Sequence, residues 1–409
     1  MTQPRGEAES PYAYLRLLTA LLVMTVGCSG MYVMAVALTP VQAEFGVTRA
    51  QASLPYTVTM IAFGIGGIIM GRLADRFGVV VPTVIGALGV GAGFVLAGLA
   101  QTLWQFILAH SLLIGIGSSA SFGPLVADTS FWFHRRRGIA VAVCASGNYL
   151  AGAVWPPILQ HFFAGIGWRA TYMWSGVLFG AAILLLSLLL RRPRPGIEVS
   201  GSASFAAHAA RPLGLSPNTL LALLCLAGLG CCIAMAMPQV HIVAYCGDLG
   251  YGAVRGAEML ALMLGCGVVS RVTWGWISDR IGGVRTLLSG AALQAMSLAL
   301  FVPFDGLVSL YVVAALFGLF QGGLVPAYAI IIREYFAPRE AGARVGMALL
   351  ATITGMALGG WVSGLIFDLA GSYRAAFVNG VAWSLLTTAI AFWLSRRQLG
   401  KTEAFVFAK

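Results

Sequence analysis

Charged residues are scarce in this sequence. Only 10% of its 409 residues are Asp, Glu, Lys or Arg, whereas a typical soluble domain carries roughly 25%. A soluble fold of this length could not cover its surface with so few charges, and a disordered chain would need more of them. Since 59% of the residues are hydrophobic, the composition indicates a protein whose exterior is solvated by lipid.

Several motifs of catalysis and cofactor binding are also missing. The sequence contains no Walker A motif, no HExxH and no GxSxG, so neither ATP hydrolysis nor a metallopeptidase or serine-hydrolase site is indicated. The seven cysteines show no metal-ligand spacing, and Cys231 and Cys232 are adjacent, which prevents an ordinary disulfide. An intramembrane enzyme is the competing class, but its nucleophile or metal cluster is lacking. We expect a protein that is not an enzyme, with no cofactor and no metal.

Long apolar segments fill most of the chain. A membrane helix needs about 20 apolar residues to cross roughly 30 Å of hydrocarbon. Twelve segments meet this description, near residues 15–39, 51–71, 79–100, 103–130, 138–164, 169–190, 217–246, 256–278, 285–303, 307–332, 341–367 and 373–395. They predict an all-α polytopic membrane protein with twelve transmembrane helices in two six-helix bundles, 1–190 and 217–409, joined by a cytoplasmic loop at 191–216.

The net charge of +11 is explained by how Lys and Arg are distributed. With the N-terminus in the cytoplasm, that side carries twenty of the 25 basic residues and the other side carries Arg49, Arg169, Arg255 and Arg374, while Arg271 lies within a span. This asymmetry is the positive-inside pattern. It predicts that both termini are cytoplasmic, and it accounts for the basic patches without nucleic acid.

The two halves of the chain resemble each other. The segment 71–78, GRLADRFG, follows the second helix, and 275–282, GWISDRIG, follows the eighth, 204 positions later. Gly147 of helix five likewise corresponds to Gly355 of helix eleven. Two parallel six-helix repeats are typical of transporters that place the substrate at the midplane between the halves.

With these motifs the sequence resembles the major facilitator superfamily over nearly its whole length. The resemblance implies a secondary transporter, functional as a monomer in the plasma membrane, that works by alternating access. It also implies a charge cluster that latches the outward-facing state, made of Gly71, Asp75, Arg76 and Asp128, with a second-half counterpart of Asp279, Arg280 and Glu334. The alternative is that these residues only determine topology.

A narrower resemblance lies between helices four and five. Residues 132–140, WFHRRRGIA, and then Gly147 are similar to the corresponding segment of monocarboxylate transporters and of bacterial oxalate/formate antiporters. The acidic-glycine-tryptophan signature of the animal branch is absent from helix one. We therefore expect a bacterial relative, located in the inner membrane.

Arg271 is the most informative single residue. It lies eight positions before Asp279, about 12 Å from the cytoplasmic end of helix eight at 1.5 Å per residue. An arginine at this depth is costly unless it faces water or a counter-charge, and its planar fork suits a carboxylate. We expect Arg271 to bind a substrate carboxylate; the alternative is a structural ion pair with another helix.

Helix eleven narrows the substrate class. Between Met347 and Ile366 it contains no Lys, Arg or His, whereas an oxalate carrier would be expected to place a second cation there. One buried cation favours a small monocarboxylate such as lactate or pyruvate. An anion exchanger of the oxalate/formate type and a multidrug or organic-ion exporter of the same fold stay open as alternatives.

Helix seven carries a histidine close to a proline. Pro238 is followed by His241 and Tyr245, which lie four positions apart and share a helix face. His241 is the candidate for proton coupling because its charge can change near neutral pH, and both residues are candidates for substrate binding. A histidine hydrogen-bonded to a neighbouring helix is the alternative.

The remaining candidates follow from the helices that line the cavity in the superfamily, together with helix five. They are polar residues within the spans, where an unpaired hydroxyl or amide is costly: Tyr32, Ser119, Asn148 and Tyr328. A serine in a membrane helix commonly bonds its own helix backbone instead. We expect the substrate, a proton and the lipid bilayer to be the partners of this protein.

Overall fold

The computed structural model describes residues 9–133, 135–192 and 212–406. Within these ranges every regular element is a helix, as the apolar segments predict. The predicted interdomain loop, 191–216, lies largely outside the described residues, because 193–211 are not among them.

Six spans form the first bundle, and two of them are broken into pieces. The first span consists of α1 (Pro11–Gly27) and α2 (Ser29–Phe45), and the fourth of α5 (Leu103–Ile107), the π-helix η1 (Leu108–Ile114), α6 (Gly115–Ala120) and α7 (Gly123–Trp132). The unbroken spans are α3 (Arg49–Phe77), α4 (Val80–Leu99), α8 (Arg137–Ile166) and α9 (Trp168–Leu188).

The second bundle repeats this plan after a short 3₁₀ turn, η2 (Pro212–Gly214). Its spans are α10 (Pro217–Asp248), α11 (Ala253–Ile281), α12 (Gly283–Leu300), the pair α13 (Leu307–Gln321) and α14 (Leu324–Tyr335), α15 (Pro338–Ala370) and α16 (Tyr373–Val406). Among the described residues, eleven spans are long and apolar enough to cross a membrane by themselves. The twelfth, α12, is shorter and packs against α13 and α16, which completes the twelve-helix fold.

The internal repeat is visible in backbone geometry and in packing. Gly78 and Gly282, which end the two repeated motifs, both have φ of +80°, a conformation that L side chains rarely adopt. Gly147 packs against α1, where an added Cβ would lie 2.8 Å from the carbonyl oxygen of Leu21. Gly355 packs against α10 in the same way, and a Cβ there would lie 2.4 Å from the carbonyl oxygen of Leu229. Corresponding glycines thus let corresponding helices touch in both bundles.

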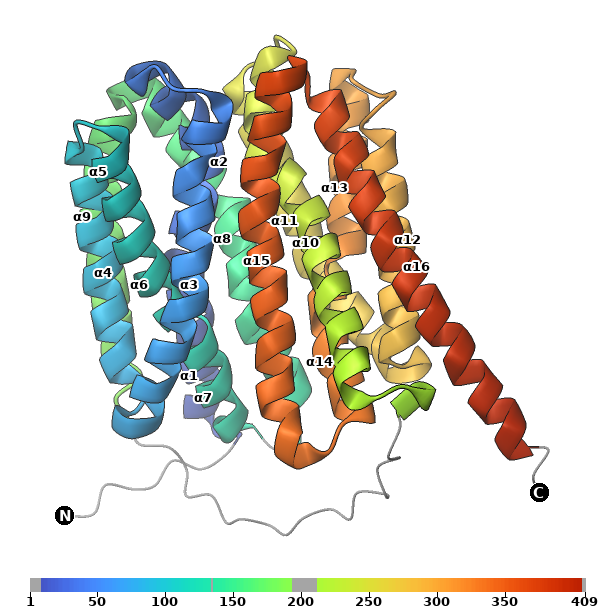
Figure 1. The fold of residues 1–409 in the computed structure, drawn as a ribbon. Helices are drawn as coiled ribbons and strands as arrows, with labels where there is room; N and C mark the ends of the chain where they lie inside the picture. Colours follow the sequence, from blue (N-terminus) through green and yellow to red (C-terminus); the bar gives the residue numbers. More distant parts are fainter. Residues whose placement is uncertain (1–8, 134, 193–211, 407–409) are drawn as a thin grey trace, which may run out of the picture.

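The two bundles stand side by side and pack along two seams (Figure 1). One seam joins α3 to α15 and the other joins α8 to α11, while α2 and α10 meet between them. The beginning of α1 and the end of α16 lie at the same end of the molecule, which we call the termini side; the opposite end is the far side.

Candidate functional site

A cavity of about 310 Å³ lies between the two bundles. Helices of both seams contribute to it, as do α2 and α10 between them. Its lining residues are Met31, Tyr32, Met60, Phe63, Gly64, Gly67, Ser119, Phe122, Gly123, Asn148, Tyr149, Cys232, Met235, Gln239, Arg271, Val325, Leu349, Thr352, Ile353 and Met356.

Arg271 is the charged residue of this lining. Its Nη1 donates a hydrogen bond of 3.0 Å to the carbonyl oxygen of Ala145, and its guanidinium carbon lies 4.2 Å from the centre of the Tyr149 ring. Its Nε is buried and has no hydrogen-bond partner among the described residues. Nor does any described carboxylate form an ion pair with it. The guanidinium is therefore held in place by α8 while it keeps donor capacity for a ligand.

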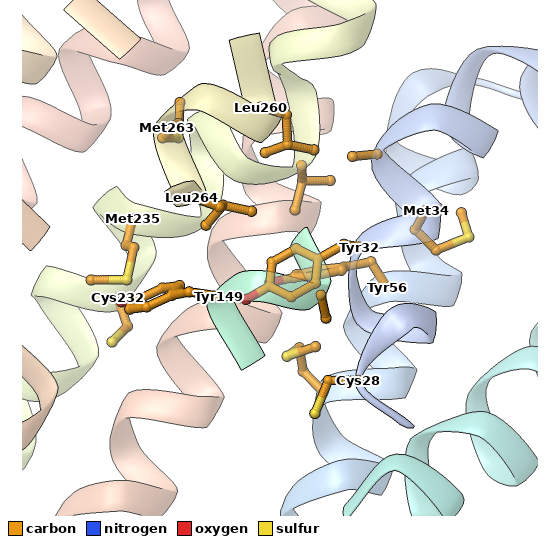
Figure 2. Packing of buried hydrophobic residues seen from close by; sticks show 14 of the residues in the cluster. Cys28, Tyr32, Met34, Tyr56, Tyr149, Cys232, Met235, Leu260, Met263 and Leu264 are labelled. Carbon is orange, nitrogen blue, oxygen red and sulfur yellow. The ribbon is translucent and has the colours of Figure 1, made fainter. Parts of the chain in front are cut away.

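Two polar pairs include residues of this lining. The Tyr32 hydroxyl donates to Oδ1 of Asn148 at 2.5 Å, and Nε2 of Gln239 donates to Oε1 of Gln321 at 2.8 Å. Figure 2 shows Tyr32 and Tyr149 among buried side chains that come from helices of both bundles. The cavity therefore has a small polar region in an otherwise apolar lining.

Four of the predicted binding residues line the cavity: Tyr32, Ser119, Asn148 and Arg271. Ser119 donates to the carbonyl oxygen of Ile116 in its own helix, which is the local bond that serines commonly make. The other three predicted residues are not among the lining residues. Tyr328 is buried and donates to the Cys231 sulfur, and Tyr245 packs against the rings of Tyr373 and Phe377; His241 lies elsewhere, as described below.

Sequence reasoning missed Tyr149, Gln239, Thr352 and the apolar side chains of α3 and α15. Tyr149 directly follows Asn148 in a membrane span, and an aromatic residue beside a mid-span amide is a signal that could have been used. Which residue of α8 faces Arg271 depends on how two helices from opposite bundles are aligned, and periodicity within each helix does not specify that alignment.

His241 belongs to a group of five residues at the far side, Arg49, His241, Asp248, Asp368 and Tyr373, which we call the far-side cluster. Arg49 is 5% exposed. Its Nη2 and Nη1 lie 3.2 Å and 3.3 Å from the Asp248 carboxylate oxygens, and Nη1 also donates to the Tyr373 hydroxyl at 2.9 Å. Arg49 begins α3, whereas Asp248 ends α10 and Tyr373 begins α16, so these bonds cross from one bundle to the other.

Asp368 connects the bundles in a second way. Its two carboxylate oxygens accept from the backbone N–H groups of Arg49 and Ala50, at 2.9 Å and 2.8 Å. These N–H groups belong to the first turn of α3 and lack partners within that helix. A carboxylate of the second bundle thus caps a helix of the first, where the helix dipole favours negative charge.

The two ring nitrogens of His241 are occupied in this cluster. Nδ1 lies 2.9 Å from the Tyr373 hydroxyl and Nε2 lies 2.8 Å from the carbonyl oxygen of Gly360. Because the Tyr373 oxygen already accepts from Arg49, its own proton is free to be donated to Nδ1. The geometry then fits a neutral imidazole that donates from Nε2 to Gly360.

The α3/α15 seam is closed toward the far side and loosens toward the termini side. Below the far-side cluster, Thr57 donates to the carbonyl oxygen of Ala357 at 2.9 Å, and the Tyr56 ring lies so near Gly360 that a Cβ there would be 2.7 Å away. Further along α3, Gly67 and Gly71 have open space around the position of a Cβ. The cavity is thus shut off from the far side.

The residues of the predicted latch lie at the termini side, where Asp128 and Glu334 each form bonds within their own bundle. Asp128 forms a buried, two-pronged ion pair with Arg16 of α1, at 2.7 Å and 3.1 Å. Glu334 accepts from the Gly283 backbone N–H at 3.0 Å. Gly71 has open space, Asp75, Arg76, Asp279 and Arg280 are exposed, and Arg280 stacks on Trp276. Their role as a latch of the outward-facing state stays a prediction.

We expect Tyr149→Leu to weaken substrate binding by about tenfold while leaving the turnover rate of the loaded protein nearly unchanged. The ring positions the Arg271 guanidinium, and such cation–π contacts contribute about 0.5–2 kcal/mol. The matched control is Tyr149→Phe, which keeps the ring and should bind like the wild type. Initial-rate uptake measured over a range of substrate concentrations separates the two parameters, and equal behaviour of the Leu and Phe variants would contradict a positioning role.

Comparison with known proteins agrees with this architecture. The family model of the Major Facilitator Superfamily matches residues 19–304 and 257–407. The MFS-type transporter opdF of Penicillium oxalicum is 28% identical, with 79% of this chain and 76% of that protein covered. Monocarboxylate transporter 13 of Rattus norvegicus is 27% identical, with 84% and 78% covered.

Solved structures show the same fold at lower identity. A bacterial homolog of the human lysosomal transporter Spinster, in an inward-facing and occupied conformation, superposes with a TM-score of 0.73 at 18% identity, over 95% of this chain and 98% of that one. A mutant of the nucleoside transporter NupG gives 0.72 at 13% identity, over 94% and 99%. The family model spans nearly the whole chain, and the fold has the two six-helix repeats that its motifs predict. The chain is therefore a multi-pass membrane transporter that belongs to the Major Facilitator Superfamily.

Proposed function

We propose that this protein is a secondary transporter that carries an organic monocarboxylate together with a proton, by alternating access, across a bacterial inner membrane. The observation that carries the proposal is Arg271, the charged residue in the described lining of the cavity, whose buried Nε has no partner. An arginine fork binds a carboxylate through two parallel N–H donors. With one cation in the lining, one carboxylate neutralises the site.

Two further observations support the substrate class. From α15 the lining contains Leu349, Thr352, Ile353 and Met356. A dicarboxylate would require a second cation opposite Arg271, and the described lining contains none. A relative that matches most of the chain is named monocarboxylate transporter 13. The fungal relative's name states no substrate.

The conformation supports alternating access. The far-side cluster joins the bundles, while the seam opens beyond Gly67 toward the termini side. The distribution of Lys and Arg favours termini in the cytoplasm, so a conformation open toward the termini side is inward-facing. The structure of the Spinster homolog is also named as inward-facing. Outward opening then requires the far-side cluster to break.

We place proton coupling at His241 in this cluster. The described residues that line the cavity include no histidine and no carboxylate. Tyr373 of α16 contacts His241 directly, and Arg49 of α3 and Asp368 of α15 interact with it electrostatically. Asp248 and Tyr245 of its own helix contact Arg49 and Tyr373, respectively. A proton on Nδ1 removes the acceptor of the Tyr373 hydroxyl and adds a positive charge beside Arg49. Both effects weaken the closure of the far side, so protonation favours outward opening.

Uptake into proteoliposomes tests the proposal. The probes are radiolabelled pyruvate and phenylpyruvate, two 2-oxo acids with the same head group, with and without an imposed inward proton gradient. We expect gradient-driven accumulation of at least one of them above protein-free liposomes. We expect His241→Gln to keep exchange of internal for external substrate but to lose accumulation driven by the gradient, because exchange needs no net proton movement.

The control for His241 is His161→Gln, which changes an exposed histidine of α8 outside the far-side cluster. It should accumulate substrate like the wild type. Exchange without any response to the gradient in the wild type would overturn proton coupling and favour an anion exchanger. If neither probe moves faster than in protein-free liposomes, by uptake or by exchange, the monocarboxylate assignment is wrong.

A further inference from the structure

The cavity has two walls of different chemistry, one on each seam. The α8/α11 seam contributes three polar residues, Asn148, Tyr149 and Arg271. The α3/α15 seam contributes Met60 and Phe63 from α3, and Leu349, Ile353 and Met356 from α15, with Thr352 as its polar side chain. The two seams face each other across α2 and α10 (Figure 1).

The apolar wall extends beyond α3 and α15. The ring of Phe122 lies 6.1 Å from that of Phe63, at an angle of 60° between their planes. Met31 of α2 and Met235 of α10 add two more thioether side chains to the lining. Methionines adapt to ligands of different shape because they are unbranched and polarizable. Together these groups can cover an apolar body from several sides.

The polar wall offers a place for one anionic group. Nη1 of Arg271 is bonded to Ala145 and its Nε is buried without a partner. Asn148 is bonded to Tyr32 through its Oδ1, which leaves its amide N–H groups as donors. A carboxylate placed here can accept hydrogen bonds from donors on both α8 and α11. The opposite wall offers few polar partners to the rest of the ligand.

The size of the cavity exceeds what a three-carbon acid needs. Its volume of about 310 Å³ lies at the lower end of the roughly 300–1,000 Å³ that is typical of pockets for small organic ligands. Lactate and pyruvate have a single methyl group as their apolar body, so they would leave the α3/α15 wall facing water. A ligand that reaches this wall removes apolar surface of both the ligand and the wall from water, which favours its binding.

We propose that the substrate is an amphipathic monocarboxylate whose aliphatic or aromatic body lies against the α3/α15 wall while its carboxylate binds Arg271. The inference rests on the proposed function and refines its substrate class. It replaces the lactate-like substrate that the sequence favours with one of larger apolar body.

A homologous series of ligands tests this inference. The straight-chain 2-oxo acids pyruvate, 2-oxobutyrate, 2-oxohexanoate and 2-oxooctanoate share one head group and differ in methylenes. Each serves as competitor against binding of radiolabelled phenylpyruvate to the purified full chain. We expect the dissociation constant to fall about three- to fourfold for each added methylene, which corresponds to ~0.8 kcal/mol per buried methylene.

Two matched isoleucine variants locate the apolar body. Ile353→Thr changes a lining residue of the α3/α15 wall, and Ile65→Thr makes the same change at a residue of α3 that is 52% exposed and outside the lining. We expect Ile353→Thr to flatten the dependence on chain length and Ile65→Thr to leave it unchanged. Arg271→Gln should weaken all members of the series by a similar factor and keep the increment per methylene.

The outcomes separate this inference from the proposed function. If affinity is independent of chain length while Arg271→Gln still weakens binding, the amphipathic substrate is wrong and the monocarboxylate assignment stands. If the primary amides of the same acids compete as well as the acids do, the carboxylate assignment itself is wrong. An increment per methylene that is equal in the wild type and in Ile353→Thr would also overturn the placement of the body on this wall.

Discussion

Replacing Arg271 by glutamine should reduce monocarboxylate transport by about 100-fold or more. Hydrogen bonds to a charged partner contribute about 1.5–3 kcal/mol each, and the guanidinium is the charged group in the described lining of the cavity. A glutamine keeps a polar amide at this position, but it is shorter than arginine and supplies no positive charge. Initial rates of phenylpyruvate uptake in proteoliposomes measure the effect.

The conservative variant Arg271→Lys is the matched control. It keeps the charge but loses the planar fork and the stacking on Tyr149, so we expect intermediate activity. Elution as a single peak in size-exclusion chromatography and an unchanged melting temperature show that the variants are folded. Wild-type rates in the glutamine variant would remove the basis of the proposed function, and they would favour an exporter of lipophilic ligands that does not need this charge.

Replacing Arg49 by glutamine should open the far side. The substitution removes both contacts to Asp248 and the bond to Tyr373, all of which join the two bundles. The Arg49 side chain is 6% exposed and that of Asp248 is 35% exposed, and hydrogen bonds to a charged partner contribute about 1.5–3 kcal/mol each. The loss of these bonds is enough to shift a two-state equilibrium strongly. We therefore expect a protein that favours the outward-facing state and transports slowly.

A cysteine at position 53 reports on this change. Ser53 is fully buried, one turn below Arg49 and next to Gly364 of the opposite bundle. In a background in which the seven native cysteines are replaced, Ser53→Cys should react with an impermeant thiol reagent from the far side at least tenfold faster when Arg49 is glutamine.

Arg169→Gln is the control for a charge lost at the same end of the molecule. Arg169 pairs with Glu44 within its own bundle, at 2.6 Å, so its loss should leave the reactivity at position 53 unchanged. Equal acceleration by both substitutions would indicate general loosening of the far side and would contradict a specific role of the far-side cluster.

The fold was accessible from the sequence because lipid imposes a simple rule. Each span must be a helix of sufficient apolar length, and the repeated motifs at 71–78 and 275–282 mark the same turn in both halves. The breaks at Cys28 in the first span and at Gly322 in the tenth were not predicted, because glycine and cysteine are common in unbroken membrane helices as well.

The site was accessible only in part. Arg271 could be found because a charge within a span is costly wherever it lies. The partners around it depend on which helices of the two bundles meet, and at what depth, and neither is encoded in the period of a single helix. His241 illustrates the limit: its position on α10 indicated a polar contact, but only its proximity to Tyr373 and Gly360 places it in the far-side cluster rather than in the cavity.

The single charge in the described lining has an electrical consequence. When the site is empty, Arg271 leaves one unneutralised positive charge inside the membrane field, where each elementary charge is worth about 2.3 kcal/mol per 100 mV across the full thickness. In the proposed cycle the bound carboxylate cancels this charge and the proton on His241 restores it, so the loaded and empty forms carry the same net charge. A full cycle then moves no net charge, and the membrane potential affects the rates of the two conformational steps but not how far the substrate is accumulated.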